Sequence, residues 1–244
     1  IENALQRIQS NTFYQAEEIF NLNELFFSWD HHSSFNSTNA TTTLEQINLS
    51  LEEAHNFLED ADVVFITLGT SWIYKLKELD FAVANCHKVP QKHFEKVLLT
   101  EAEIIESIKN SIKIIEEMAP NAEVIVTASP VRHIKDGIVE NNVSKARLLS
   151  ALYEVSVQHE NVTYFPSYEL LMDDLRDYRF YADDLLHPNK QAVDYIWGKF
   201  SETYFEEETV QLNKQIEKLM IALNHRPFNE DSEAHQKFIS NTIE

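Results

Sequence analysis

Three short apolar runs, separated by segments with helical spacing, constrain the fold of this chain most. The runs are residues 63–68, 124–128 and 162–165. Residues 63–68 are too few for a buried helix and apolar at nearly every position, as in a central strand of a parallel sheet. The segments between the runs repeat apolar residues every three or four positions, as in 105–115 and 148–155, which is typical of helices. The order strand, helix, strand, helix, strand predicts an α/β fold with right-handed crossovers and helices on both faces of a parallel sheet.

The rest of the chain is expected to surround this sheet as one domain. No internal repeat or Pro/Gly-rich linker divides the 244 residues, so we expect a domain over residues 1–205, followed by a C-terminal helix and tail over 206–244. Residues 1–20 have moderate helical spacing. Residues 72–76 and 81–84 predict a short hairpin or excursion between the first strand and the next helix.

Composition and charge exclude several classes of protein. Forty Asp and Glu residues oppose twenty Lys and Arg, and a net charge of −20 repels nucleic acid and anionic membrane surfaces. A single cysteine, Cys86, cannot form an internal disulfide, which favours a reducing compartment. No apolar run approaches the roughly 20 residues of a membrane span, and no signal peptide opens the chain. We therefore expect a cytoplasmic protein with no nucleic-acid partner.

No metal or other cofactor is predicted. Asp30, His31 and His32 could be taken for metal ligands, but their spacing does not fit a helical zinc motif and no third ligand is identifiable nearby. We expect them to be satisfied within their own loop.

Ligands of open parallel sheets bind beyond the carboxyl ends of the strands, where the connecting loops gather. Two loops at that edge carry candidate substrate-binding or oxyanion-binding residues, which are Gly69, Thr70, Ser71, Trp72, Arg132 and His133. Arg132 and His133 could bind a carboxylate or phosphate of a substrate. Alternatively, Arg132 pairs with one of the forty carboxylates of the chain itself.

The loop after the third strand carries the strongest candidate for catalysis. Pro188 disfavours a helical conformation at His187 and suits the first turn of the helix that follows, so the imidazole has a fixed position at a helix entrance. Asp184, three residues earlier, can accept a hydrogen bond from one ring nitrogen and leave the other to take a proton. The spacing predicts a general base, His187, and its orienting carboxylate, Asp184. An Asp-x-x-His contact that only caps the helix is the alternative.

Five segments in order resemble the bacterial GSCFA-domain proteins, which are similar to the SGNH (GDSL-type) hydrolases. The segments are residues 27–33, 68–74, 84–88, 129–133 and 177–188. The resemblance runs to about residue 206. It implies a three-layer α/β/α fold with flavodoxin-like strand order, and ester hydrolysis or acyl transfer by a serine nucleophile. Asp184 and His187 would be the other two members of the triad.

The sequence departs from that family pattern in two places. The Gly-Ser-Cys-Phe-Ala block that carries the presumed nucleophile is absent, so we expect the first strand and the serine to lie upstream of Ile1 and this chain to be inactive alone. The usual Gly-x-Asn-Asp is replaced by Gly-Thr-Ser-Trp at 69–72. Ser71, a backbone amide or Asn85 could then supply the oxyanion donor, and His87 could line the site.

The resulting hypothesis is a serine esterase or acyltransferase that acts on an acyl ester of a small molecule, a glycan or a lipid. The alternative is a non-catalytic, ligand-binding domain of the same fold that has lost its oxyanion hole. Ser71 is disfavoured as nucleophile because Trp72 follows where an elbow needs a small residue. Cys86 is expected in the core. The C-terminal helix could serve a homodimer contact or cap the core.

Overall fold

The computed structural model describes residues 1–223 and residue 237, and it divides into two compact units, Ile1–Pro188 and Asn189–Glu244. The first unit contains the sheets and the loops predicted to carry chemistry. The second begins at Asn189, and its described residues are largely helical. The domain boundary predicted after residue 205 stays a prediction.

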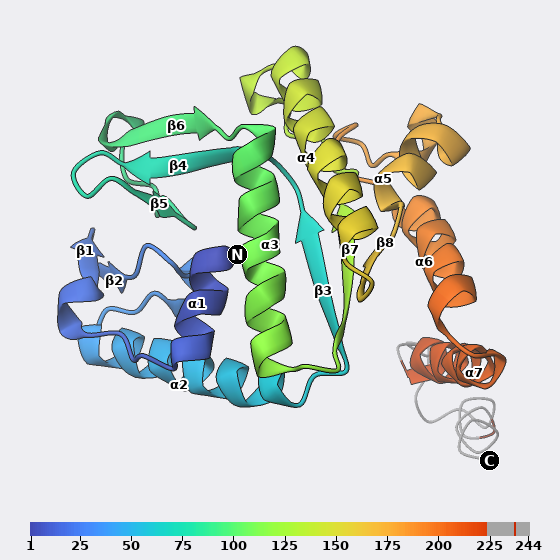
Figure 1. Cartoon of the computed structure of the whole chain (residues 1–244), viewed down its shortest axis with the longest axis horizontal. Helices are drawn as coiled ribbons and strands as arrows, with labels where there is room; N and C mark the ends of the chain where they lie inside the picture. Colours follow the sequence, from blue (N-terminus) through green and yellow to red (C-terminus); the bar gives the residue numbers. More distant parts are fainter. Residues whose placement is uncertain (224–236, 238–244) are drawn as a thin grey trace. The chain divides into compact units, whose positions relative to one another are not determined.

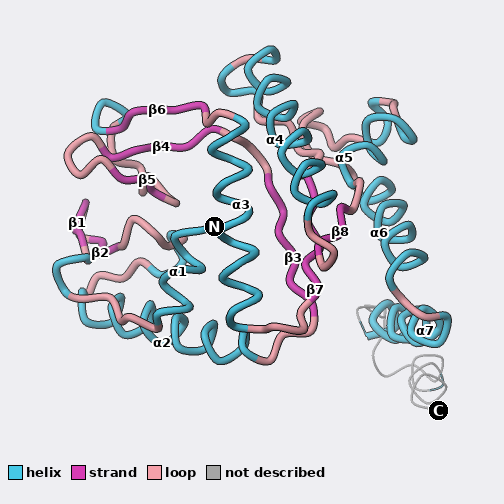
Figure 2. The backbone as a smooth tube through the Cα atoms, viewed as in Figure 1, coloured by secondary structure: helices cyan, strands magenta, loops and turns pink. Residues whose placement is uncertain are grey.

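The first unit is built on a parallel three-stranded sheet flanked by helices (Figures 1 and 2). Its strands, in spatial order, are β3 (Val63–Leu68), β7 (Glu123–Ala128) and β8 (Val162–Tyr164). The connecting helices are α3 (Glu101–Met118) and α4 (Ile138–Gln158). The predicted alternation is confirmed, and this mixed α/β fold is compatible with the three-layer α/β/α arrangement.

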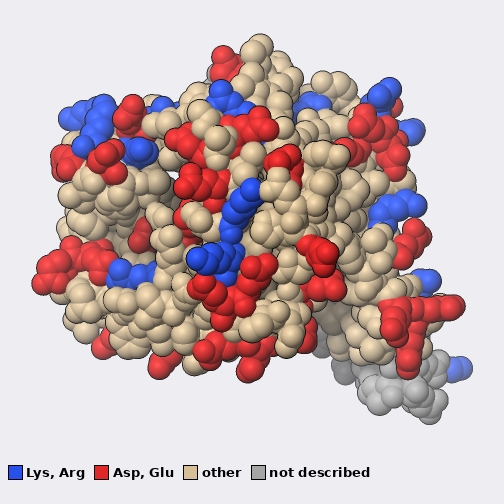
Figure 3. All heavy atoms as spheres, in the orientation of Figure 1, with Lys and Arg blue, Asp and Glu red and all other residues tan. Residues whose placement is uncertain are grey.

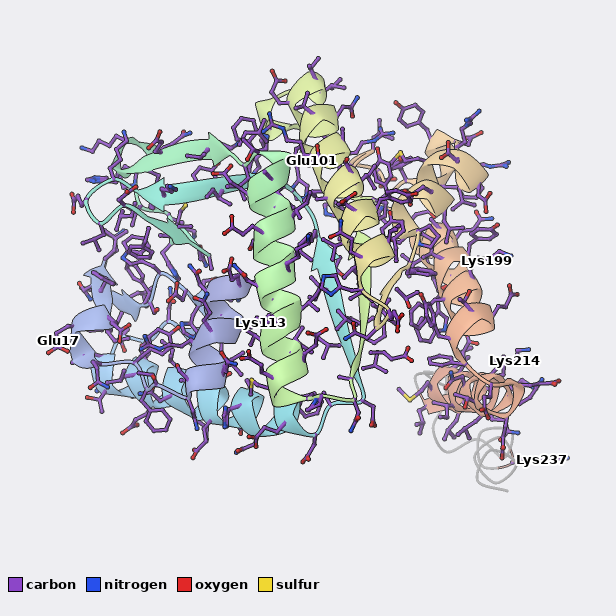
Figure 4. All side chains as sticks on the ribbon, viewed as in Figure 1. Glu17, Glu101, Lys113, Lys199, Lys214 and Lys237 are labelled. Atoms are coloured by element: carbon purple, nitrogen blue, oxygen red, sulfur yellow. The ribbon has the colours of Figure 1, made fainter. Side chains whose placement is uncertain are left out.

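One face of the sheet forms the main core. Ile112 and Ile115 of α3, and Leu152 and Val155 of α4, are fully buried against the sheet, where they meet side chains such as Val124. Figure 1 shows α3 and α4 side by side, with α3 next to β3 and α4 passing in front of β7. Figure 4 labels Glu101 at the start of α3. The Glu101 carboxylate accepts a hydrogen bond from Ser150 Oγ of α4 at 2.5 Å. The apolar stripes predicted for these two segments therefore face the sheet.

Residues 63–68 form a parallel strand, as predicted, but among the described residues it has a neighbour on one side only, which fits the expectation that the family's first strand lies outside residues 1–244. The middle strand is β7, which pairs with both β3 and β8, and β3 lies at the edge. Ile66 packs into the core, whereas Val63 and Phe65 on the opposite face are 44% and 57% exposed. An unbroken apolar run shows that a strand can be covered on both faces, but it does not show how many neighbours the strand has.

The N-terminal region is less helical than its spacing predicts. Helix α1 (Glu2–Ser10) ends because Asn11 adopts a left-handed conformation (φ 45°), which asparagine tolerates better than most residues. The chain then forms a short hairpin and a long helix. These elements are β1 (Phe20–Leu22), β2 (Leu25–Phe27) and α2 (Ala40–Glu59).

The predicted excursion after β3 is part of an antiparallel sheet. Its strands, in spatial order, are β5 (Phe81–Val83), β4 (Trp72–Leu76) and β6 (Phe94–Leu98). The hairpin was predicted, but β6 was not. Because β6 is short and mixes Glu95 and Lys96 with apolar residues, it has no clear strand pattern of its own.

The start of α3 is fixed by a capping box. Thr100 Oγ1 accepts a hydrogen bond from Glu103 N at 3.3 Å, and Glu103 Oε2 accepts one from Thr100 N at 2.7 Å. These bonds satisfy backbone donors that have no partner within the helix.

We expect Thr100→Ala to lower the free energy of unfolding by about 1 kcal/mol, since it removes the acceptor for the Glu103 amide. Urea denaturation measures the loss. Thr100→Ser keeps the hydroxyl and is the matched control, with an expected change of less than about 0.5 kcal/mol. Equal losses in the two variants would show that the methyl group of Thr100, and not its hydrogen bond, stabilises this end of α3.

The second unit contains α6 (Lys190–Tyr204) and α7 (Glu207–Leu223). Asn189 Oδ1 caps α6 by accepting a hydrogen bond from Ala192 N at 3.1 Å. Trp197 stacks on Phe200, with ring centroids 5.6 Å apart. Across the described residues, none of the helices combines the length and the apolar character needed to cross a membrane.

Acidic and basic side chains are interspersed on the surface. Figure 3 shows more extensive acidic than basic regions over the face drawn there, in keeping with the net charge of −20.

Candidate functional site

The loops after β3 and β7 meet at the carboxyl edge of the parallel sheet. Ser129 N, just beyond β7, donates to Leu68 O at the end of β3 at 2.8 Å. Gly69 lies against His133, because a Cβ added to Gly69 would approach His133 Nε2 to 3.1 Å. The backbone N–H of His133 is fixed in turn by Asn141 Oδ1 of α4 at 2.8 Å. The structure thus brings Gly69 and His133 together, as the position of these loops predicts.

The loop after β8 joins the same edge through Arg132. The Arg132 backbone N–H donates to Leu186 O at 3.3 Å. Within that loop, Ala182 N donates to His187 O at 2.8 Å, and Tyr181 forms an isolated β-bridge with Pro188. The loop that carries Asp184 and His187 is therefore closed on itself and attached to the loop after β7.

Asp184 and His187 form a hydrogen-bonded pair. Asp184 Oδ2 lies 2.6 Å from His187 Nδ1. Asp184 Oδ1 accepts hydrogen bonds from the backbone N–H groups of Leu186 and His187, at 2.9 and 3.0 Å. Both oxygens of the carboxylate are used, so the side chain caps the turn and orients the ring at the same time.

Three hydrogen bonds keep the Asp184 carboxylate ionised. The backbone N–H of His187, its ring N–H and the backbone N–H of Leu186 lower the pKa of Asp184 to about 2. An ionised carboxylate accepts a hydrogen bond from Nδ1–H and so selects the tautomer whose Nε2 can take a proton. The His187 side chain is 60% exposed, and no hydrogen bond among the described residues uses Nε2. The pair can act as a general base toward a hydroxyl that approaches from solvent.

Leu185, between the two members of this pair, has a strained backbone. Its φ is 58°, in the left-handed region, which costs a residue with a branched side chain about 1–2 kcal/mol. The hydrogen bonds of Asp184 to the next two amides, and that of Leu185 N to Ala182 O at 2.9 Å, stabilise the turn against this cost.

Arg132 is bound by two tyrosines, Tyr178 and Tyr181, of the loop that carries Asp184 and His187. Its Nη2 donates to Tyr181 Oη at 3.0 Å, and its guanidinium carbon lies 4.4 Å from the ring centroid of Tyr181 and 5.4 Å from that of Tyr178. No carboxylate among the described side chains pairs with it. The alternative in which Arg132 pairs with a carboxylate of the chain is therefore wrong within the described side chains.

Thr70, Ser71 and Trp72 are turned toward other parts of the fold. Ser71 is 2% exposed, and its hydroxyl donates to Ser144 O of α4 at 3.0 Å. Its backbone N–H donates to Ser144 Oγ at 2.8 Å, and Thr70 Oγ1 lies 3.0 Å from the same oxygen. Trp72 begins β4, where Lys96 Nζ lies 4.9 Å from the centroid of its ring. In this arrangement the Ser71 hydroxyl and amide are engaged by α4 and not presented to a substrate.

Asn85 and His87 lie in the excursion, in contact with the loop after β2. Asn85 N donates to Trp29 O at 3.2 Å, and His87 Nε2 lies 2.8 Å from Ser28 O. The His87 ring stacks on Phe27 with centroids 4.3 Å apart, and burial lowers the pKa of His87. None of these contacts reaches the loop with Asp184 and His187.

The loop at residues 30–32 is satisfied only in part by local contacts, because His31 Nδ1 is buried and has no hydrogen-bond partner among the described residues. Asp30 Oδ2 accepts from Tyr14 Oη at 3.2 Å, and the His31 ring packs edge-on against Tyr14, with centroids 5.0 Å apart. His32 caps a short turn by accepting from Ser34 N. Among the described residues, no cluster of three or more His, Cys, Asp or Glu side chains could hold a metal ion.

Lys145, which the sequence did not single out, lies beneath the loops that follow β3 and β7. It is 1% exposed, and its Nζ donates to Gly69 O at 2.6 Å and to Ser129 O at 2.5 Å. Burial lowers the pKa of Lys145 to about 8. The signal was present, because Lys145 falls on the same helical stripe as Leu148 and Leu152. It joins the chain segments that follow two neighbouring strands.

Comparison with known proteins gives two matches to family models. The model described as the GSCFA family matches residues 1–200, and the model described as the C-terminal domain of GSCFA domain proteins matches residues 216–244. No curated protein matches the chain.

Proposed function

Because the chain belongs to the GSCFA family, we propose that it carries the acid–base pair of a serine esterase or acyltransferase, with His187 as general base and Asp184 as its orienting carboxylate. The observation that carries this proposal is the 2.6 Å contact between Asp184 Oδ2 and His187 Nδ1. The contact lies in a loop attached to the carboxyl edge of the parallel sheet, which is the usual position of ligand sites in such folds.

In the proposed reaction, His187 Nε2 takes the proton of a serine hydroxyl while the serine oxygen attacks an acyl carbonyl carbon. Asp184 stabilises the imidazolium that forms. The C–O bond to the alcohol then breaks, and the imidazolium returns its proton to the leaving alkoxide. Water or an acceptor hydroxyl attacks the acyl-serine by the same steps. The resemblance assigns the serine to a block that the printed sequence does not contain, so the proposal places the nucleophile outside residues 1–244.

The backbone is the remaining candidate for the oxyanion donor in this proposal. The Ser71 hydroxyl and amide are bonded to Ser144, and the side chain of Asn85 is turned to the excursion, where its Oδ1 accepts from the backbone N–H of His87 at 3.0 Å. A backbone amide donates as well as a side-chain amide does, provided that its loop is held rigidly. Lys145 supplies that rigidity, because its ammonium group binds the carbonyl oxygens of Gly69 and Ser129.

The engagement of Ser71 favours one second candidate, a ligand-binding domain without catalysis. A site that lacks a donor for the developing oxyanion can retain affinity for an ester and lose turnover. The two candidates differ in one chemical property, which is the reactivity of a serine.

A serine-directed fluorophosphonate probe separates the candidates. The natural protein, with any residues encoded ahead of Ile1, is treated with the probe and the labelled peptide is identified by mass spectrometry. We expect one serine to be labelled, and His187→Ala to slow labelling by about 10²-fold or more, because the hydroxyl loses its base. His32→Ala, which changes an exposed histidine of another loop, is the control and should label normally. Absence of specific labelling in the parent would support the ligand-binding candidate.

A further inference from the structure

Arg132 has no carboxylate partner among the described side chains, and neither has Arg147, whose guanidinium binds the backbone carbonyls of Leu98 and Leu99. Arg7 pairs with Glu18 at 2.9 Å and Arg176 with Asp173 at 3.4 Å, as expected in a chain with forty acidic residues. Among the described side chains, Arg132 bonds no carboxylate. It donates one hydrogen bond, to the neutral hydroxyl of Tyr181. Its positive charge is therefore not neutralised by the part of the protein that the structure describes.

The tyrosines fix the guanidinium and use only one of its N–H donors. A ring that packs on the flat face of a guanidinium stabilises the cation and leaves the N–H groups at its edge available. The group has five N–H donors, and the Tyr181 hydroxyl takes one. Because Arg132 is half-buried and its guanidinium lies against the rings of Tyr178 and Tyr181, little side-chain freedom is left to lose when an anion binds.

Arg132 contacts the loop of the acid–base pair at two points. Its backbone N–H is bonded to Leu186 O, one residue before His187. Its guanidinium is bonded to Tyr181, which forms a bridge with Pro188, one residue after His187. A group bound by Arg132 is thus held by the same loop that positions the imidazole.

We propose that Arg132 binds an anionic group of the ligand, a carboxylate or a phosphate, beside the His187 pair. The net charge of −20 repels anions from most of the surface, so a cation at the site selects the anionic ligands that the rest of the molecule disfavours. A guanidinium matches the two oxygens of a carboxylate or phosphate with two parallel hydrogen bonds. That the ligand is also an ester rests on the proposed function, whereas the binding of the anion does not.

The first test measures binding alone. Succinate and inorganic phosphate are titrated separately into the natural protein, and the ¹⁵N–¹H resonance of Arg132 Nε is followed by NMR. We expect one or both anions to shift this resonance saturably, and Arg132→Gln to weaken binding by about 10- to 100-fold. Arg179→Gln is the matched control, since Arg179 is an exposed arginine of the same loop whose guanidinium lies 4.8 Å from the Phe180 ring. The more tightly bound anion identifies the group. If neither binds, or if both variants bind as the parent does, the proposal is wrong whatever the outcome for catalysis.

The second test concerns the reaction and uses two esters with the same leaving group. These are 4-nitrophenyl acetate and the mono-4-nitrophenyl ester of succinic acid, which differ by a carboxylate-bearing arm. We expect the kcat/KM ratio of the anionic to the neutral ester to fall about 10- to 100-fold in Arg132→Gln, chiefly through KM, and to recover partly in Arg132→Lys. An equal loss on both esters would mean that Arg132 acts on the reacting oxygen and not on a ligand anion. If neither ester reacts in the parent, the proposed function fails and the binding test still decides the role of Arg132.

Discussion

Replacing His187 by alanine is expected to lower kcat/KM for a short-chain acyl ester by about 10²- to 10⁴-fold, the usual contribution of a general base. The reason is local. Asp184 fixes the Nδ1 proton, so Nε2 is the nitrogen that can accept the proton of the attacking hydroxyl. The measurement is initial-rate hydrolysis by the natural protein, with protein folding checked by circular dichroism.

Two further variants separate catalysis from loop structure. Asp184→Asn keeps an oxygen that can accept from the amides of Leu186 and His187, but it removes the charge that stabilises the imidazolium. We expect a loss of comparable order with an unchanged melting curve. His32→Ala should retain activity, because His32 lies in another loop. Parent-like turnover in His187→Ala would remove His187 from the mechanism and leave the Asp184 contact as a helix-entrance cap.

Titration of Asp184 should not contribute to the pH dependence of activity above pH 4. The pKa of Asp184 is lowered to about 2 from an ordinary 3.8. The carboxylate is therefore fully ionised and hydrogen-bonded above pH 4, and it becomes protonated only as the pH falls toward 2. An acidic limb of the activity profile above pH 4 should therefore persist in Asp184→Asn. If it disappeared in that variant, Asp184 would be titrating at a pH well above that given by its hydrogen bonds.

The acid–base pair could be predicted from the sequence because it is a local structure. Asp184, His187 and Pro188 lie within five residues, and the restrictions that proline imposes on its neighbours act through covalent geometry. The alternation of strands and helices was predicted for a similar reason, since hydrophobic periodicity is read within one segment at a time.

Features that depend on distant segments could not be predicted in this way. Whether β3 is central or at an edge depends on which other strands pair with it, and its own residues do not encode that number. The partner of Ser71 is Ser144 of α4, 73 positions away in the chain. Arg132 could pair with any of forty carboxylates, and only the fold shows that two tyrosines hold it instead.

Lys145 has one feature that is visible in its own segment and one that depends on distant segments. Its burial also predicts a pH-dependent effect on the free energy of unfolding. Its position on the apolar stripe of α4 is visible in the sequence, but the carbonyl oxygens that it meets belong to Gly69 and Ser129. Burial favours the neutral amine, which can still donate both hydrogen bonds, over the ammonium ion. The pKa therefore falls from 10.5 in the unfolded chain to about 8 in the folded one, which corresponds to about 3 kcal/mol.

The sign of the pH effect follows from proton binding. Below pH 8 both states carry the proton, and the folded state bears the full cost of the buried charge. Between about pH 8 and 10.5 the unfolded chain binds more protons at this residue, so the free energy of unfolding rises with pH by up to about 3 kcal/mol. Above that range both states are neutral and the contribution is constant. We expect Lys145→Met, which keeps the length of the side chain and removes its titration, to lack this rise.

Urea denaturation at pH 7.5 and 10.5 measures the effect as a difference between parent and variant, because the titration of other lysines and tyrosines is common to both. Lys113→Met is the matched control, since the Lys113 side chain on α3 is 73% exposed and should show the pH dependence of the parent. At pH 7.5, Lys145→Met loses two hydrogen bonds to buried carbonyls, each costing about 1–3 kcal/mol, but it is also relieved of a buried charge worth about 3 kcal/mol. These terms nearly cancel at neutral pH, so the variant should lose stability relative to the parent mainly in alkaline solution. A constant difference between the two proteins at both pH values would show that Lys145 titrates in the folded state as it does in the unfolded chain.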